Sequence, residues 1–432
     1  MKNTYVALLL ILITSVQAQN KKYNLVIGTY TNSCDSKGIY VYDFDSETAD
    51  FNFKNSTEKV VNPSYLTISK DNKFVYSVNE SGPESTVSAF AFDAKSGKLD
   101  LLNKQNAEGA DPCYLINDDK NVIVANYSGG NIAVFGKNSD GSISKSKQVI
   151  QHFGKGINTK RQEGPHVHMV YFSPDKKYIL SNNLGNDKIY IYKYNPESTS
   201  ETLQFKDSVS VKSGSGPRHL TFSKDGKFVY LLQELDGALT IFSYANGTLK
   251  KIGETTILAK DFKGVFSSAD IHISPDGKFL YASNRGEANT ITIFKILKTG
   301  KLTLVGQTSS LGKGPRNFAI DPSGNFLLVG HQYTNEVVIF KRNKFCFRML
   351  IHMETVCDEI EEDMHNIEEV EIFLLLQNTI FNFTKEILKK ERFKGNIGQE
   401  QLWFLIELKS NRSLYEDYYL TISSLPFPFA TG

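Results

Sequence analysis

Short runs of apolar and β-branched residues, separated by polar turns, follow one another along most of the chain. One stretch shows the pattern clearly, with extended runs at residues 219–222, 228–234, 238–244 and 248–254. Turns at Asp225-Gly226, Asp236-Gly237 and Asn246-Gly247 separate these runs, and such dipeptides favour tight hairpins. Residues 23–344 show no helical periodicity. The pattern therefore predicts four antiparallel strands joined as a meander.

This four-strand unit recurs about every 50 residues. Its openings follow polar loops and lie at Pro63, Pro112, Pro165, Pro217, Ala269, where alanine replaces the proline, and Pro315. Before the first full unit, residues 25–30, 39–44 and 51–54 supply three further strands. A repeat of about 50 residues with four antiparallel strands is typical of a propeller blade. The six units and the partial one predict an all-β, seven-bladed β-propeller over residues 23–344.

The amino-terminal residues do not follow this pattern. Lys2 precedes an apolar run over residues 5–16, and the small residues Val16 and Ala18 occupy the two positions that determine cleavage after Ala18. This layout predicts a secretory signal peptide over residues 1–18, and therefore a periplasmic or secreted protein. The alternative is an uncleaved anchor, although the run is shorter than the ~20 apolar residues that span a bilayer. We expect no stable membrane insertion after cleavage.

Residues 345–432 form a tail of different composition, with 15 acidic and 8 basic residues. Apolar residues at mixed spacings of three and four between 353 and 392 predict that the tail is partly helical. The tail is either an appended segment of unknown role or the product of a changed reading frame. The repeat stops before the last strand of blade seven and before a strand that would close blade one. Residues 419–423 repeat the sequence of residues 65–69 and are one candidate for that closing strand.

Composition and cysteine spacing exclude several classes of protein. The net charge of +2 provides no basic field for nucleic-acid binding. Four scattered cysteines without CxxC spacing predict free thiols, with a single disulfide as the alternative: Cys34, Cys113, Cys346 and Cys357. His352, Cys357 and His365 fit no standard zinc spacing, so no metal is predicted. We expect a monomer that acts on a small molecule.

The blade topology itself predicts where a functional site lies. In a meander blade, the loop that enters the first strand and the loop that leaves the second lie at the same end of the sheet. The first strands line the central channel, so polar residues at those two positions converge on the axis. The candidates collected there are Asn79, Glu80, Asn126, Tyr127, His166, His168, Asn183, Arg218, His219, Glu234, Asp270, His272, Asn284, Arg285, Arg316, Asn317, His331 and Gln332. Arginine binds carboxylates and phosphates bidentately, so the set predicts an electropositive pocket for an anionic ligand.

Some of these candidates have an alternative structural role. His166 and His219 can satisfy backbone groups between blades, and Asp270 and His272 alternate with apolar neighbours at the start of an inner strand. Glu234 can form a purely structural ion pair with an arginine of the next blade. Glu234 and His168 are nevertheless the two groups suited to moving a proton near neutral pH.

Several motifs resemble those of the lactonase propeller family, which includes bacterial 6-phosphogluconolactonases and fungal carboxymuconate lactonising enzymes. They are residues 161–168 (RQEGPHVH), 214–219 (GSGPRH), 269–277 (ADIHISPDG), Arg285 after Ser283-Asn284, and 314–318 (GPRNF). The matches occur in the expected order between about residue 25 and residue 343. The resemblance implies catalytic roles for four residues: His168, Arg218, Glu234 and Arg285. His166, Asn284, Asp270, His272, Arg316 and Asn317 are then candidates for substrate binding.

The resemblance implies hydrolysis of a small, anionic sugar or acid lactone without a cofactor or an obligatory metal. Glu234 or His168 would activate water, while Arg218 and Arg285 would hold the substrate anion and the developing oxyanion. One alternative is a non-catalytic exported propeller that binds an anionic sugar or a protein partner. Another is a cycloisomerase that forms a lactone in the same pocket.

Overall fold

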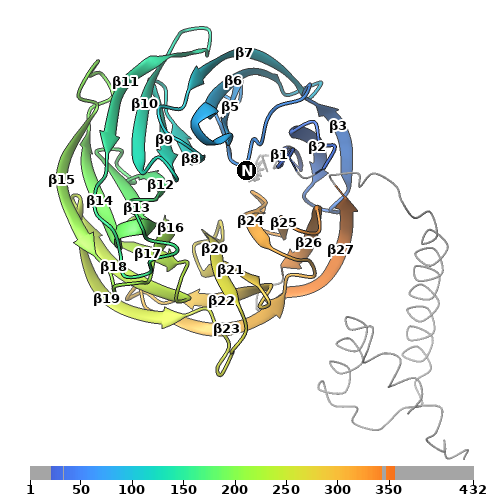
Figure 1. Ribbon diagram of the computed structural model, residues 1–432. Coiled ribbons are helices and arrows are strands. Elements are labelled where there is room, and N and C mark those ends of the chain that lie inside the picture. The colour runs from blue at the N-terminus through green and yellow to red at the C-terminus, as the bar shows by residue number, and fades with distance from the viewer. Residues whose placement is uncertain (1–20, 33, 343–346, 356–432) are drawn as a thin grey trace, which may run out of the picture. The chain divides into compact units, whose positions relative to one another are not determined.

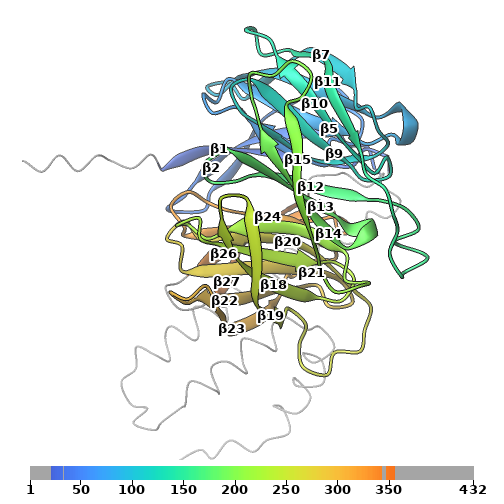
Figure 2. The ribbon, with the colours of Figure 1, turned by 90° about the vertical axis from the view of Figure 1, so that its left-hand side faces the viewer.

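Each repeat of the sequence folds into one antiparallel sheet. The computed structural model describes residues 21–32, 34–342 and 347–355. In this part of the chain there are six four-stranded sheets and one three-stranded sheet. Figure 1 shows them arranged around a central axis, and Figure 2 shows the same ring from the side, with outer strand β15 facing the viewer. The predicted seven-bladed β-propeller is confirmed.

The strands follow one another along the chain from the axis to the rim in each complete sheet. The innermost strands are β4 (Leu66–Ile68), β8 (Pro112–Asn117), β12 (Val167–Phe172), β16 (Pro217–Phe222), β20 (Phe266–Ile273) and β24 (Pro315–Ile320). The second strands are β5 (Phe74–Asn79), β9 (Asn121–Asn126), β13 (Tyr178–Asn183), β17 (Phe228–Gln233), β21 (Phe279–Gly286) and β25 (Phe326–His331). The third are β6 (Thr86–Asp93), β10 (Asn131–Lys137), β14 (Lys188–Tyr194), β18 (Ala238–Ala245), β22 (Thr290–Ile296) and β26 (Glu336–Arg342). The outermost are β7 (Lys98–Asn106), β11 (Ile143–Gln151), β15 (Leu203–Ser210), β19 (Thr248–Thr256), β23 (Leu302–Ser309) and β27 (Phe347–Thr355).

The core lies between neighbouring sheets, and burial falls from the middle of each blade toward its rim. All residues of β9 are buried, because both faces of this strand are covered by adjacent blades. The outer strand β7 instead alternates between buried and exposed positions near its start. A central strand covered on both faces reads as a nearly continuous apolar run, and an edge strand reads as an alternating one. The sequence of each repeat therefore already specifies the depth of its strands.

The first and seventh sheets depart from the regular pattern. The first contains β1 (Lys22–Gly28), β2 (Ile39–Asp45) and β3 (Phe51–Ser56), and no described strand pairs with the inner edge of β1. Accordingly, β1 is only half-buried, whereas the second strands of the other sheets are almost fully buried. In the seventh sheet, β27 pairs antiparallel with β26. The expectation that this blade lacks its last strand is wrong. The sequence of β27 does not follow the repeat, but the strand pairs with β26 through backbone groups, which any sequence provides.

The predictions for the cysteines and for the terminal segments can be compared only in part with the described residues. Cys34 is disulfide-bonded, so the prediction of free thiols is wrong for Cys34 and confirmed for the buried Cys113. The signal peptide, the helical tail and the strand proposed at residues 419–423 lie outside the described residues. Within the described part, no helix is long and apolar enough to cross a membrane.

Candidate active site

The site lies where the innermost strands begin, and a shared irregularity of these strands builds it. Five of them shift register against their second strands at the equivalent position, so one extra residue stands there. Such a bulge bends the strand and re-aims a side chain. The residues at the bulges are Cys113, His168, Arg218, Ala269 with Asp270, and Arg316. All but one of these residues belong to polar or reactive side-chain types, which gives the channel mouth its chemistry.

At this end, hydrogen bonds join the loop that enters the first strand of a blade to the loop that leaves the second strand. In the blade of β16 and β17, the Glu234 backbone N–H donates to the Gly216 carbonyl at 2.8 Å, and Leu235 N–H donates to Ser215 O at 2.9 Å. Gly216 has a φ of +66°, which a side chain rarely permits, and a Cβ there would crowd Leu235. This turn places Arg218 and Glu234 next to each other, as the topology predicted.

Glu234 is the centre of the site and is ion-paired with three arginines. Arg161 Nη2 lies 2.5 Å from Oε1. Arg218 Nε and Arg285 Nη2 lie 3.0 Å and 3.4 Å from Oε2. Arg218 Nε contacts Oε2 as an ion pair and, among the described residues, makes no hydrogen bond. Ser267 Oγ donates to Oε1 at 3.1 Å and accepts from Arg285 Nη2 at 2.7 Å.

The charge state of Glu234 follows from these neighbours. Glu234 is only 3% exposed, and burial alone would raise its pKa. Arg285, Arg218 and Arg161 outweigh that effect and lower the pKa to about 2. Glu234 is therefore ionised at neutral pH, with both oxygens occupied by donors. A carboxylate of this kind is a weak proton acceptor and a strong anchor for arginine side chains.

His168 supplies a neutral ring beside this cluster. Its Nε2 lies 4.0 Å from Glu234 Oε2, which is too long for a direct hydrogen bond. Its Nδ1 lies 3.6 Å from Cys113 Sγ, and the Cys113 thiol donates to the His168 carbonyl at 3.5 Å. Burial raises the pKa of Cys113, so it stays a thiol. These contacts favour a proton on His168 Nδ1 and leave Nε2 free to accept one.

A second polar group lies around Arg316. The Arg316 guanidinium lies 5.6 Å from the centre of the Tyr30 ring, and its Nη1 donates to Gln332 Oε1 at 3.5 Å. Tyr30 Oη donates to Glu80 Oε1 at 3.1 Å, and Ser64 donates to the same oxygen. Among the described residues, no carboxylate lies within ion-pair distance of Arg316. Its charge is therefore less neutralised than that of the other three arginines.

The carboxylate of Asp270 is bound by side chains of the inner strands and, among the described residues, has no contact with the arginines that pair with Glu234. Its Oδ1 is 2.9 Å from His219 Nδ1 and its Oδ2 is 2.9 Å from His272 Nε2. Asn317 Nδ2 also donates to Oδ2, at 2.7 Å. His219 Nε2 in turn lies 3.3 Å from Arg218 Nη1. The expectation that His219 satisfies backbone groups is therefore wrong, because its ring joins Asp270 to Arg218.

Two other predicted residues support the site from its margins. His166 Nδ1 lies 3.1 Å from the Tyr127 carbonyl, as expected for a histidine that satisfies a backbone group, and its ring stacks on Tyr127 at 4.4 Å. Asn284 is fully buried and its Oδ1 accepts from the Ser267 N–H at 3.2 Å. Neither side chain contacts Glu234.

Sequence reasoning missed Arg161 and Ser267, both of which contact Glu234. Arg161 belongs to a motif that carried the family resemblance. It lies in the long loop between β11 and β12, and the repeat pattern does not predict where the side chains of that loop lie. Ser267 precedes the bulge of β20, in the repeat whose opening proline is absent. The one available signal was the position of Arg161 three residues before Gly164-Pro165, inside the motif of residues 161–168.

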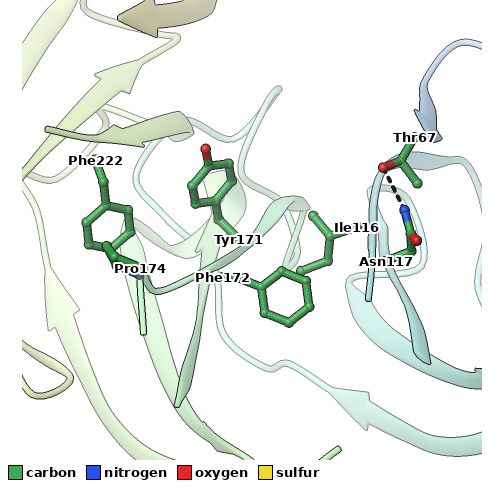
Figure 3. A pocket seen from close by; sticks show the side chains of 7 residues that line it. All are labelled: Thr67, Ile116, Asn117, Tyr171, Phe172, Pro174 and Phe222. Atoms are coloured by element: carbon green, nitrogen blue, oxygen red, sulfur yellow. Dashed lines mark hydrogen bonds between the residues drawn. The ribbon is translucent and has the colours of Figure 1, made fainter. Parts of the chain in front are cut away.

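A cavity of about 360 Å³ lies at the other end of the inner strands. Figure 3 shows that aromatic side chains dominate its lining, with Tyr171, Phe172 and Phe222 at the ends of β12 and β16. Two of its polar side chains bind each other, since Asn117 Nδ2 donates to Thr67 Oγ1 at 3.0 Å. No predicted site residue lines this cavity, so the charged mouth remains the candidate active site.

Comparisons with known proteins agree with the propeller fold. The family model described as "Lactonase, 7-bladed beta-propeller" matches residues 24–346. The 6-phosphogluconolactonase of Formosa agariphila is 38% identical over 326 residues, which are 74% of this chain and 92% of the relative.

Two solved structures are similarly close. A putative 6-phosphogluconolactonase from Bacteroides fragilis has a TM-score of 0.73 and 42% identity, covering 79% of this chain and 96% of that one. The periplasmic gluconolactonase of Pseudomonas aeruginosa has a TM-score of 0.73 and 33% identity, with coverages of 78% and 97%. Fold, family match and full-length relatives point the same way. The chain belongs to the lactonase family of seven-bladed β-propellers, a family of carboxylic-ester hydrolases.

Proposed function

We propose that the protein hydrolyses a small sugar or acid lactone that carries a negative charge. The observation that carries this proposal is a neutral histidine beside an ionised glutamate that holds three arginines. Arg316 lies beside this cluster and, among the described residues, has no carboxylate within ion-pair distance, so positive charge remains available at the mouth. An anionic substrate would neutralise that charge.

We assign the proton transfer to His168 rather than to Glu234. His168 Nε2 would accept a proton from water as the water oxygen bonds to the lactone carbonyl carbon. The carbonyl oxygen would then carry negative charge, which arginine donors stabilise. Collapse of this intermediate breaks the ring C–O bond, and His168 returns the proton to the departing oxygen. The products are the open hydroxy acid and the regenerated histidine.

Arg218 and Arg285 have donors available for the oxyanion. In the part of the chain that the structure describes, Arg218 Nη2 and Arg285 Nη1 have no hydrogen-bond partner. Both side chains are nearly buried, so a donor aimed at developing charge would act with little competition from water. Glu234 holds these two side chains in place through its Oε2.

The substrate class can be tested with purified protein and a panel of lactones. We expect turnover of a phosphorylated or carboxylated sugar lactone above the spontaneous rate, measured as acid release in a pH-stat. In Glu234→Gln we expect kcat to fall and KM to rise together, because the arginines lose the anchor that positions them. A folded wild-type protein that binds the open acid but hydrolyses no lactone would instead indicate a binding protein.

The pH dependence follows from the charge state of His168. Burial, followed by the charges of Arg218 and His219, lowers the pKa of His168 well below its ordinary 6.5. Such a group stays neutral, and able to accept a proton, down to more acidic pH than a free histidine. We therefore expect kcat/KM, which reports the free enzyme, to remain level from about pH 8 to below 6.5. An acid limb centred at or above 6.5 would contradict the assignment.

We further propose that the enzyme works outside the cytoplasm. The predicted signal peptide at residues 1–18 supports export, and the similar Pseudomonas aeruginosa protein is described as periplasmic. Fractionation of cells that express the full chain, with the mature amino terminus determined by mass spectrometry, tests this. A protein retained in the cytoplasm with an intact amino terminus would argue against export.

A further inference from the structure

Arg161 differs from the other arginines of the site in origin and exposure. Arg218, Arg285 and Arg316 lie on strands β16, β21 and β24, whereas Arg161 lies on the loop of residues 152–166 between β11 and β12. The Arg161 side chain is 40% exposed, compared with 2% for Arg218 and 9% for Arg285. It is therefore the arginine of the Glu234 cluster that a molecule entering from solvent meets first.

The loop holds Arg161 in a defined position. Its neighbour Gln162 is fully buried, and Gln162 Nε2 donates to Leu184 O and to Asp187 Oδ1, both at 2.8 Å. Asp187 Oδ1 also accepts from the Gly216 N–H at 2.9 Å, in the turn that leads to Arg218. The loop is thus attached to the same turn that builds the deep part of the site. Exposure of Arg161 reflects its place at the rim and not a loose backbone.

The guanidinium of Arg161 keeps donors for a ligand. Its Nη2 donates to Glu234 Oε1 at 2.5 Å and to Tyr127 Oη at 3.3 Å. Within the described ranges, Arg161 Nε and Nη1 have no hydrogen-bond partner. Tyr127 is itself fixed by stacking on His166. One edge of the guanidinium is therefore fastened to the site, while donors on the rest of it remain free.

We propose that Arg161 determines substrate specificity by binding an anionic group on the part of the lactone that points toward solvent. This inference rests on the proposed lactone hydrolysis and adds the residue that selects a charged substrate over a neutral one. The deep residues act on the ester, which is common to both substrates. Phosphate monoesters and carboxylates both suit the free fork of an arginine, and the experiment separates them.

The test compares steady-state kinetics of wild type and Arg161→Gln on three lactones: neutral gluconolactone, 6-phosphogluconolactone and glucarolactone, which carries a carboxylate. We expect KM for the anionic substrate to rise about 10- to 100-fold in the variant, as for loss of charge-assisted hydrogen bonds. We expect kcat for that substrate, and both constants for the neutral lactone, to change by less than about threefold. The anionic lactone whose KM rises identifies the group that Arg161 binds.

Two further variants serve as controls. Lys160→Gln removes the same charge from the adjacent exposed position of the loop, which has no contact with Glu234, and should leave all constants unchanged. Arg161→Lys keeps the charge without the planar fork and should restore part of the affinity. Thermal unfolding of each variant checks the fold.

Three other outcomes would contradict the inference, and the measurements distinguish them from one another. Equal losses on neutral and anionic lactones would mean that Arg161 acts only through Glu234. Unchanged kinetics in Arg161→Gln would remove Arg161 from substrate binding. If the folded wild type hydrolyses none of the three lactones, the proposed function fails and this inference fails with it.

Discussion

Replacing His168 with asparagine is expected to lower kcat for lactone hydrolysis by about 10²- to 10⁴-fold, the usual contribution of a general base. Asparagine retains the size and polarity of the position but cannot accept and return a proton. KM should change little, because the arginines that bind the anion are held by Glu234 and not by His168. Initial rates on the best lactone of the panel, corrected for spontaneous hydrolysis, measure this effect.

His152 provides a matched control for this substitution. It is also buried, and burial lowers its pKa to about 4, so it is a second neutral histidine. Its Nε2 contacts Tyr192 Oη at 2.7 Å and its Nδ1 contacts Asn183 Nδ2 at 2.9 Å, and within the described residues its ring has no contact with Glu234 or with the arginines paired to it. Per folded molecule, His152→Asn should retain wild-type activity. A His168→Asn enzyme with nearly full kcat, alongside an inactive Glu234→Gln enzyme, would transfer the role of base to Glu234.

The architecture of the propeller could be predicted because it depends on local sequence. A polar turn follows the first strand of every full repeat, as at Asp225-Gly226, and the position of each strand between axis and rim follows from how continuous its apolar run is. The convergence of Arg218, Glu234 and Arg285 could also be predicted, since meander topology alone brings their loops to one end. Their contacts in the structure agree with that expectation.

Other features depend on long-range contacts that no local pattern records. The bulges that re-aim His168 and Arg218 require knowledge of register between two strands. Arg161 reaches Glu234 across 73 positions of sequence from a loop without repeat periodicity. Asp270 alternates with apolar residues and was a candidate for substrate binding, but the structure surrounds it with donors from three blades.

These contacts of Asp270 lead to the largest expected effect on stability. Asp270 is 3% exposed and accepts from residues on β16, β20 and β24, so one carboxylate joins three inner strands. Asp270→Asn takes the charged acceptor away from the neutral His219 and from the partly exposed His272, and a hydrogen bond to a charged group contributes about 1.5–3 kcal/mol. Urea unfolding at neutral pH should show a decrease of this size in the free energy of unfolding. Asp225→Asn, at an exposed turn, should change it by less than about 0.5 kcal/mol.

The same substitution should change the response to acid, and the sign follows from the pKa of Asp270. Burial would raise that pKa, but His272 and His219 outweigh burial and lower it below the ordinary 3.8. A carboxyl group whose pKa is lowered by folding stabilises the protein above its ordinary pKa, and this contribution is lost as the pH falls through the folded-state value. The wild type should therefore lose stability below about pH 4 more steeply than Asp270→Asn.

An Asp270→Asn protein that is destabilised equally at every pH would show that packing, and not ionisation, accounts for the loss. Activity provides an independent readout, because His219 carries the effect from Asp270 to Arg218. A neutral His219 that donates from Nδ1 to Asp270 presents its Nε2 lone pair to Arg218 Nη1. Without Asp270 the ring loses this preference, and Arg218 loses part of its support. We therefore expect lower kcat/KM in the folded variant, with a larger loss for the lactone step than for binding of the open acid.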